Sequence, residues 1–95
     1  MSKRIGADRE RKTRHLDEAL GAELTELRVA HQWSQQRLSE VAGYDPSYIR
    51  QLERGTKSAT LRTLSDLSSA FSLSASELIQ RAEARLQPNP SKKDY

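Results

Sequence analysis

Apolar residues in this chain recur every three or four positions, which is the period of an amphipathic α-helix. A first helix is predicted from about Asp17 to about His31, and an earlier start near Asp8 is the alternative. The same period predicts four more helices, whose apolar positions are Leu38, Val41 and Ala42; Ile49 and Leu52; Leu61, Leu64, Leu67 and Phe71; and Leu78, Ile79, Ala82 and Leu86. No segment shows the alternation of a half-buried strand. The predicted fold class is therefore all-α, with five helices joined by short links.

Each of the four later helices is preceded by a residue that caps helices well. These residues are Ser34, Asp45, Thr60 and Ser74. A hydroxyl or carboxylate at this position accepts a hydrogen bond from a free backbone N–H of the first turn. Glu77 adds a capping box with Ser74, and Gly43 and Gly55 suit the left-handed position that ends a helix. The helix boundaries are therefore predicted by local chemistry alone.

The segment from Trp33 to Gly55 predicts two short helices around a glycine turn, which is the layout of a helix-turn-helix. One face of its second helix is polar, with donors at i, i+3, i+4 and i+7: Ser47, Arg50, Gln51 and Arg54. Arginine pairs bidentately with guanine and glutamine with adenine in the major groove of DNA. The alternative is an ordinary solvated helix face.

Composition narrows the function further. The 95 residues fit one small domain, and 35% are hydrophobic and 31% charged. The chain has no cysteine, so disulfides, thiolate chemistry and cysteine-bound zinc are excluded, and we expect neither metal nor cofactor. No apolar run approaches the roughly 18 residues of a membrane span, so we expect no membrane partner and a cytoplasmic location. No nucleophile motif or glycine-rich phosphate loop suggests an enzyme.

The positive charge is concentrated at one end of the chain. The net charge is +3, while residues 1–14 alone hold six Lys or Arg against two acidic residues, a surplus of +4. We divide the chain into a basic extension (1–16), a folded domain (17–87) and a disordered tail (88–95). The extension is an arm, a longer first helix or disorder, and it either binds phosphates or serves as a solvated tail.

From Leu20 to about Arg81, the sequence resembles the xenobiotic-response-element (XRE) family of helix-turn-helix DNA-binding domains. The matching segments are LGAELTELR (20–28), WSQQRLSEVAG (33–43), YIRQLERG (48–55) and LSSAFSLSASEL (67–78). The resemblance implies the five-helix fold of lambda-type phage repressors and Cro. It also implies a sequence-specific transcription regulator that binds double-stranded DNA.

The polar stripe and the resemblance together suggest roles for specific residues. Pro46 occupies a place where many relatives carry a base-reading side chain, so this chain would lack that contact. The base-reading candidates are therefore the stripe residues Ser47, Arg50 and Gln51. The phosphate-binding candidates are Gln35, Tyr48, Arg54 and Lys57. Tyr48 has the alternative of covering the core. In the family, the matches of Arg28 and Glu53 form a pair that clamps the first helix to the recognition helix, which we expect to be mainly structural here.

The expected function is repression as a homodimer on a palindromic operator, since two half-sites about 34 Å apart multiply the specificity of one short recognition helix. The candidate dimer interface is on the fifth helix: Leu78, Ile79, Ala82 and Leu86. These residues have the alternative of only covering the core. A different function is that of an antitoxin, which binds a partner protein, a toxin or another regulator, and represses its own operon.

Overall fold

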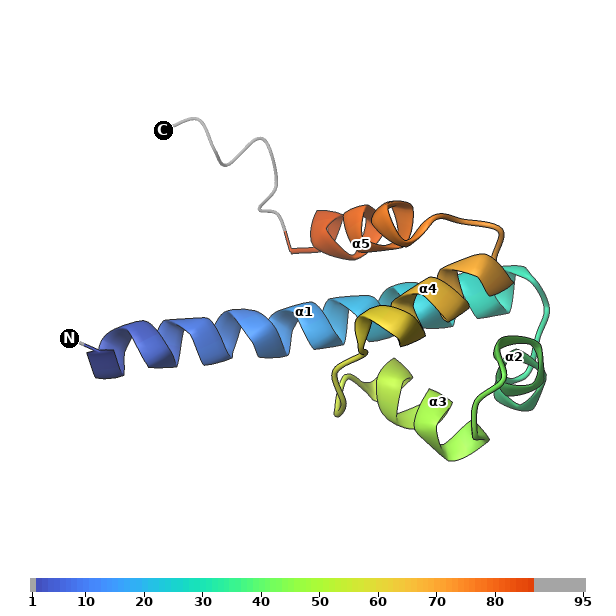
Figure 1. Ribbon diagram of the computed structural model, residues 1–95, viewed down its shortest axis with the longest axis horizontal. Coiled ribbons are helices and arrows are strands. Elements are labelled where there is room, and N and C mark those ends of the chain that lie inside the picture. Colours follow the sequence, from blue (N-terminus) through green and yellow to red (C-terminus); the bar gives the residue numbers. More distant parts are fainter. Residues whose placement is uncertain (1, 87–95) are drawn as a thin grey trace.

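The computed structural model describes residues 2–86 and contains five helices in that range (Figure 1). The helices are α1 (Ser2–Ala30), α2 (Gln35–Ala42), α3 (Pro46–Arg54), α4 (Leu61–Ala70) and α5 (Ala75–Ala84). The described residues include no strand, and the predicted all-α, five-helix class is confirmed. The tail predicted to be disordered lies outside the described residues.

The four predicted caps begin α2 to α5, each accepting a hydrogen bond from a backbone N–H of its own first turn. The pKa of Asp45 is lowered because its carboxylate accepts hydrogen bonds from the backbone N–H and the hydroxyl of Ser47. Gly43 and Gly55 follow α2 and α3 with φ angles of 83° and 76°, the left-handed conformation that glycine adopts without a steric penalty. These boundaries are confirmed.

The first helix is much longer than the prediction of a start at Asp17, since α1 begins at Ser2. Of the three alternatives for the basic extension, the structure has the longer helix. Its sequence contains no proline and is rich in Lys and Arg, which favour the helix, and Gly6 is the one strong helix breaker in residues 2–14. The part of α1 that precedes the folded body therefore projects beyond the other helices (Figure 1).

The helices are arranged around α1, which lies between α3 on one side and α5 on the other (Figure 1). Helix α4 packs against α5, and α2 packs against both α3 and α4. All five helices contribute to one core, in which six large apolar side chains are at most 1% exposed: Leu24, Leu38, Ile49, Leu52, Leu67 and Leu78. Trp33 packs against this core and stacks on Phe71, with ring centroids 5.6 Å apart.

Two residues predicted to face the core are exposed instead. Val41 is 39% exposed, and Leu61 is 85% exposed. Leu61 shares a helical face with the buried Ser68, but it is the first residue of α4 and lies where no neighbouring element covers it. The period of the apolar residues identifies the apolar face of a helix. How much of that face is buried depends on which other helices pack against it.

Helices α1 and α3 cross with their backbones in direct contact at Gly21. A Cβ atom at this position would lie 2.4 Å from the carbonyl oxygen of Glu53 and 2.5 Å from that of Leu52. Real Cβ atoms essentially never approach backbone atoms so closely. Glycine at this place therefore sets the distance between the first helix and the helix that carries the polar stripe.

Gly21→Ala is expected to lower the free energy of unfolding by about 1–3 kcal/mol, the usual cost of overpacking a closed contact. Alanine ordinarily stabilises the interior of a helix relative to glycine by about 0.5–1 kcal/mol, so the expected sign is reversed. Urea denaturation measures the difference. Ala22→Gly, at the exposed neighbouring position, serves as the control and should cost only the ordinary helix propensity. A Gly21→Ala protein as stable as the wild type would contradict the close crossing.

Candidate nucleic-acid interface

Helices α2 and α3 pack against each other across the turn at Gly43, and α3 presents its predicted polar stripe to solvent. Ile49 and Leu52 are each 1% exposed, so they bind α3 to the core. The four stripe residues are all exposed: Ser47, Arg50, Gln51 and Arg54. The structure thus brings these side chains together on one accessible face of a helix that is held rigidly from behind.

The N-terminal end of this stripe is partly occupied by the cap of α3. The Ser47 hydroxyl donates to Asp45 Oδ1 over 2.9 Å, and the Ser47 backbone N–H donates to the same oxygen over 2.7 Å. Because its pKa is lowered, the Asp45 carboxylate stays ionised to a lower pH than an ordinary aspartate. The Ser47 oxygen keeps its acceptor capacity, while Arg50 and Gln51 have exposed donors further along the helix.

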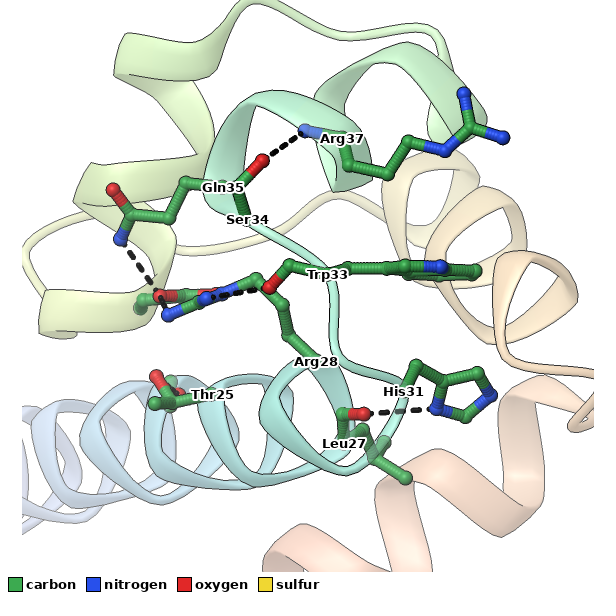
Figure 2. Close-up of polar contacts among 10 residues, drawn as sticks. Thr25, Leu27, Arg28, His31, Trp33, Ser34, Gln35 and Arg37 are labelled. Atoms are coloured by element: carbon green, nitrogen blue, oxygen red, sulfur yellow. Dashed lines mark hydrogen bonds and ion pairs between the residues drawn. The ribbon is translucent and has the colours of Figure 1, made fainter.

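The predicted pair of Arg28 and Glu53 joins α1 to the last turn of α3. Arg28 Nε donates to Glu53 Oε2 over 2.7 Å, and Arg28 Nη2 donates to Oε1 over 3.1 Å. A third donor, Arg28 Nη1, bonds the carbonyl oxygen of Trp33 over 2.9 Å (Figure 2). The side chains of Arg28 and Glu53 are 16% and 5% exposed, so the bidentate pair is well shielded from water.

Gln35 is the first residue of α2, and it belongs to the same cluster. Its side-chain Nε2 donates to Glu53 Oε1 over 2.8 Å, so one carboxylate oxygen accepts from both Arg28 and Gln35 (Figure 2). An amide nitrogen carries two hydrogens, so one N–H of Gln35 is left for another acceptor. Sequence reasoning missed this contact, because no local pattern links residues that are 18 positions apart.

Tyr48, predicted either to contact the DNA backbone or to cover the core, lies partly buried between α3 and α4. Its hydroxyl is 3.4 Å from Thr63 Oγ1, and its ring lies 5.6 Å from that of Tyr44. Tyr44 in turn donates to Asp66 Oδ2 over 2.6 Å, which raises the pKa of Tyr44. The structure therefore gives Tyr48 the core-covering position, with its hydroxyl directed to α4.

Exposed cations lie at the end of α3 and on the segments that precede and follow it in the chain. Arg54 ends α3, and Lys57 follows in the link to α4. Arg62, in the first turn of α4, is exposed as well, although sequence reasoning did not select it. The sequence feature that could have identified Arg62 is its position in the first turn after the Thr60 cap, five residues after Lys57. Arg37 on α2 is exposed and lies 3.5 Å from Glu40, which offsets part of its charge.

Other kinds of site find less support. A hollow of about 580 Å³ lies between α1 and α5, on the side of α1 that faces away from α3, and its charged residues are paired with one another: Glu23, Glu26, Arg81 and Arg85. Among the side chains that the structure describes, those of residues 15–86, no group of three or more acidic or histidine residues is placed to hold a metal ion. No helix in this part of the chain has the length and apolar character needed to cross a membrane.

A model of the helix-turn-helix family HTH_3 matches residues 24–78, which include the Arg28–Glu53 pair, the polar stripe and the start of α5. A search among curated proteins gave no match.

Among solved structures, the clp gene regulator ClgR from Corynebacterium glutamicum is similar, with 30% identity over 75% of this chain and 76% of that chain and a TM-score of 0.70. The restriction-modification controller protein C.AhdI from Aeromonas hydrophila is also similar, with 34% identity over 65% of this chain and 94% of that chain and a TM-score of 0.63. The chain therefore belongs to the helix-turn-helix family HTH_3, of the XRE type, and is a DNA-binding transcription regulator.

Proposed function

We propose that the protein is a sequence-specific repressor that binds a palindromic operator as a homodimer. The observation that carries this proposal is the exposed stripe on α3, which includes Arg50 and Arg54 and is backed by buried Ile49 and Leu52. A rigid helix with accessible donors on one face suits the major groove, which admits an α-helix and displays a distinct pattern for each base pair. Arg50 and Gln51 are the proposed base-reading residues, with Ser47 beside them.

Contacts to the DNA backbone are proposed for Gln35, Arg54 and Lys57. Gln35 lies at the N-terminus of α2, where unpaired backbone N–H groups and the helix dipole favour an anion. Its bond to Glu53 holds the side chain in place and leaves one amide N–H for a phosphate oxygen. Because Glu53 lies in the last turn of α3 and Gln35 begins α2, the carboxylate links the proposed phosphate contact to the proposed base-reading helix.

In the proposed dimer, the contact between the two copies must leave both α3 helices on the same side of the dimer, so that both can enter the major groove of one operator. Leu78 and Ala82 have no exposed surface, so a partner cannot reach them. The accessible candidates are Ile79 on α5 and Leu86, which was predicted on the fifth helix but lies two residues beyond its end at Ala84. Leu86 is 42% exposed. The start of α4, where Leu61 is 85% exposed, and the end of α5 lie toward the same end of the molecule (Figure 1). A two-fold axis at that end would satisfy the requirement.

No contact in the described part of the chain favours the alternative of an antitoxin. Its distinctive requirement is a second surface for a partner protein. Double-stranded DNA is therefore the partner we propose, together with a second copy of the chain.

Gln51→Ala and Arg50→Ala are each expected to weaken operator binding by about 1–3 kcal/mol and to relax the preference at one base position, because each removes a bidentate base contact. Duplexes bound from a random pool at one stated salt concentration reveal the operator, and titration then gives the affinities. Gln36→Ala, at an exposed position of α2, is the control. Equal losses on operator and random DNA would exclude that residue from base reading.

Gln35→Ala is expected to weaken binding to operator and random duplexes by the same factor, because a phosphate contact is independent of sequence. The dependence of affinity on salt should stay unchanged, since glutamine carries no charge and displaces no counterion. Titration of both duplexes at several salt concentrations measures the two effects. A loss confined to the operator would show instead that Gln35 acts through the orientation of α3.

Leu61→Glu combined with Leu86→Glu is expected to give monomers, because two charges would be placed in the proposed apolar contact. Analytical ultracentrifugation without DNA measures the state. Val29→Glu is the control, because Val29 is an apolar residue that is also exposed (60%) but lies on the last turn of α1, outside the proposed interface. If the double variant stays dimeric, the proposed interface is wrong.

A further inference from the structure

The basic helical extension, residues 2–14, is the N-terminal part of α1. Residues 1–14 carry a surplus of +4, although the whole chain carries only +3. Residues 15–86 hold eight Lys or Arg against ten Asp or Glu, so this part of the protein has a net charge of −2. A folded domain with a negative net charge is poorly suited to attract a polyanion over a distance.

The extension joins the folded domain beside the proposed interface. At Gly55, just after α3, a Cβ atom would lie 2.8 Å from the Cα atom of Glu18 on α1. The hydroxyl of Ser58, in the link from α3 to α4, donates to Asp17 Oδ2 over 2.7 Å. Lys57, one of the proposed phosphate contacts, is the neighbour of Ser58. The basic part of α1 therefore joins the folded domain next to the C-terminal end of α3.

We propose that the basic helical extension binds DNA phosphates next to the half-site that α3 contacts, an inference that rests on the proposed function. The extension is continuous with α1, so its direction is set by the folded domain. At 1.5 Å per residue, 13 helical residues span about 20 Å, close to the width of a DNA duplex. The surplus positive charge of the extension adds to the charges of Arg54 and Lys57 near the end of α3.

Two other binding partners of the extension are less well supported: a second copy of the extension and an anionic membrane. A second copy of the extension would bring two surpluses of +4 together, which is repulsive in the absence of a polyanion. An anionic membrane surface would attract the same charge, but stable binding of an interfacial helix also needs an apolar face. The extension offers only Ile5 and Ala7 between Ser2 and Arg14. The neighbouring recognition helix makes DNA the favoured partner.

The experiment compares two charge variants of the full-length protein with the wild type. In the neutral variant, six residues are changed to glutamine, which preserves helix propensity: Lys3, Arg4, Arg9, Arg11, Lys12 and Arg14. In the second variant, Asp8→Asn and Glu10→Gln raise the surplus of the extension. Affinity for the selected operator is measured between 50 and 200 mM salt. Urea denaturation checks that the folded domain is unaffected.

The neutral variant should bind the operator at least tenfold more weakly at 50 mM salt. Its plot of log affinity against log salt should be shallower by about 0.9 for each phosphate that the extension no longer neutralises. The Asp8→Asn, Glu10→Gln variant should bind more tightly and show a steeper plot. The base preference selected from a random pool should be the same for all three proteins, because phosphate contacts carry no sequence information.

Wild-type affinity and salt dependence in both variants would overturn this proposal. Strong binding of the wild type to anionic phosphatidylserine vesicles, with unchanged operator binding by the neutral variant, would assign the extension to membranes instead and would also overturn it. These results are distinct from failure of the proposed function. In that case the wild type itself would select no sequence from the random pool.

Discussion

The carboxylate of Glu53 is the contact on which the geometry of the interface depends. It accepts two hydrogen bonds from Arg28 and one from Gln35, and thus joins α1, α2 and α3 at one point. Removal of one partner from a shielded ion pair costs about 3–5 kcal/mol, because the remaining charge stays away from water. The cluster therefore stabilises the fold and holds the two helices of the helix-turn-helix in a constant relative position.

The backbone contact at Gly21 acts on the same junction. A side chain there would push α1 away from the carbonyl groups of Leu52 and Glu53, which are two of the last residues of α3. The length of the Arg28–Glu53 hydrogen bonds depends on that separation. Close backbone packing and the buried ion pair thus support each other, and the exposed stripe on the far side of α3 is free for recognition.

Local chemistry explains why the helix boundaries were predictable and the helix partners were not. The caps Ser34 and Asp45 and the glycines at 43 and 55 act within one turn of their own position, so short segments suffice to recognise them. The bond of Gln35 to Glu53 and the exposure of Leu61 depend on elements distant in sequence. The start of α1 was left open between a longer helix, an arm and disorder because apolar spacing begins only at Leu16, and the structure has the longer helix, from Ser2.

The amino-acid sequence by itself determined the all-α class, the four caps, the helix-turn-helix and the polar stripe, because periodicity and capping are local properties. Through the resemblance it also indicated the family and the Arg28–Glu53 pair. Only the tertiary structure decided that Gln35 shares the Glu53 carboxylate, that Tyr48 faces α4 and that Leu78 and Ala82 are buried. Contacts and burial arise when separate helices pack together, and a helical pattern shows which face is apolar without showing what covers it.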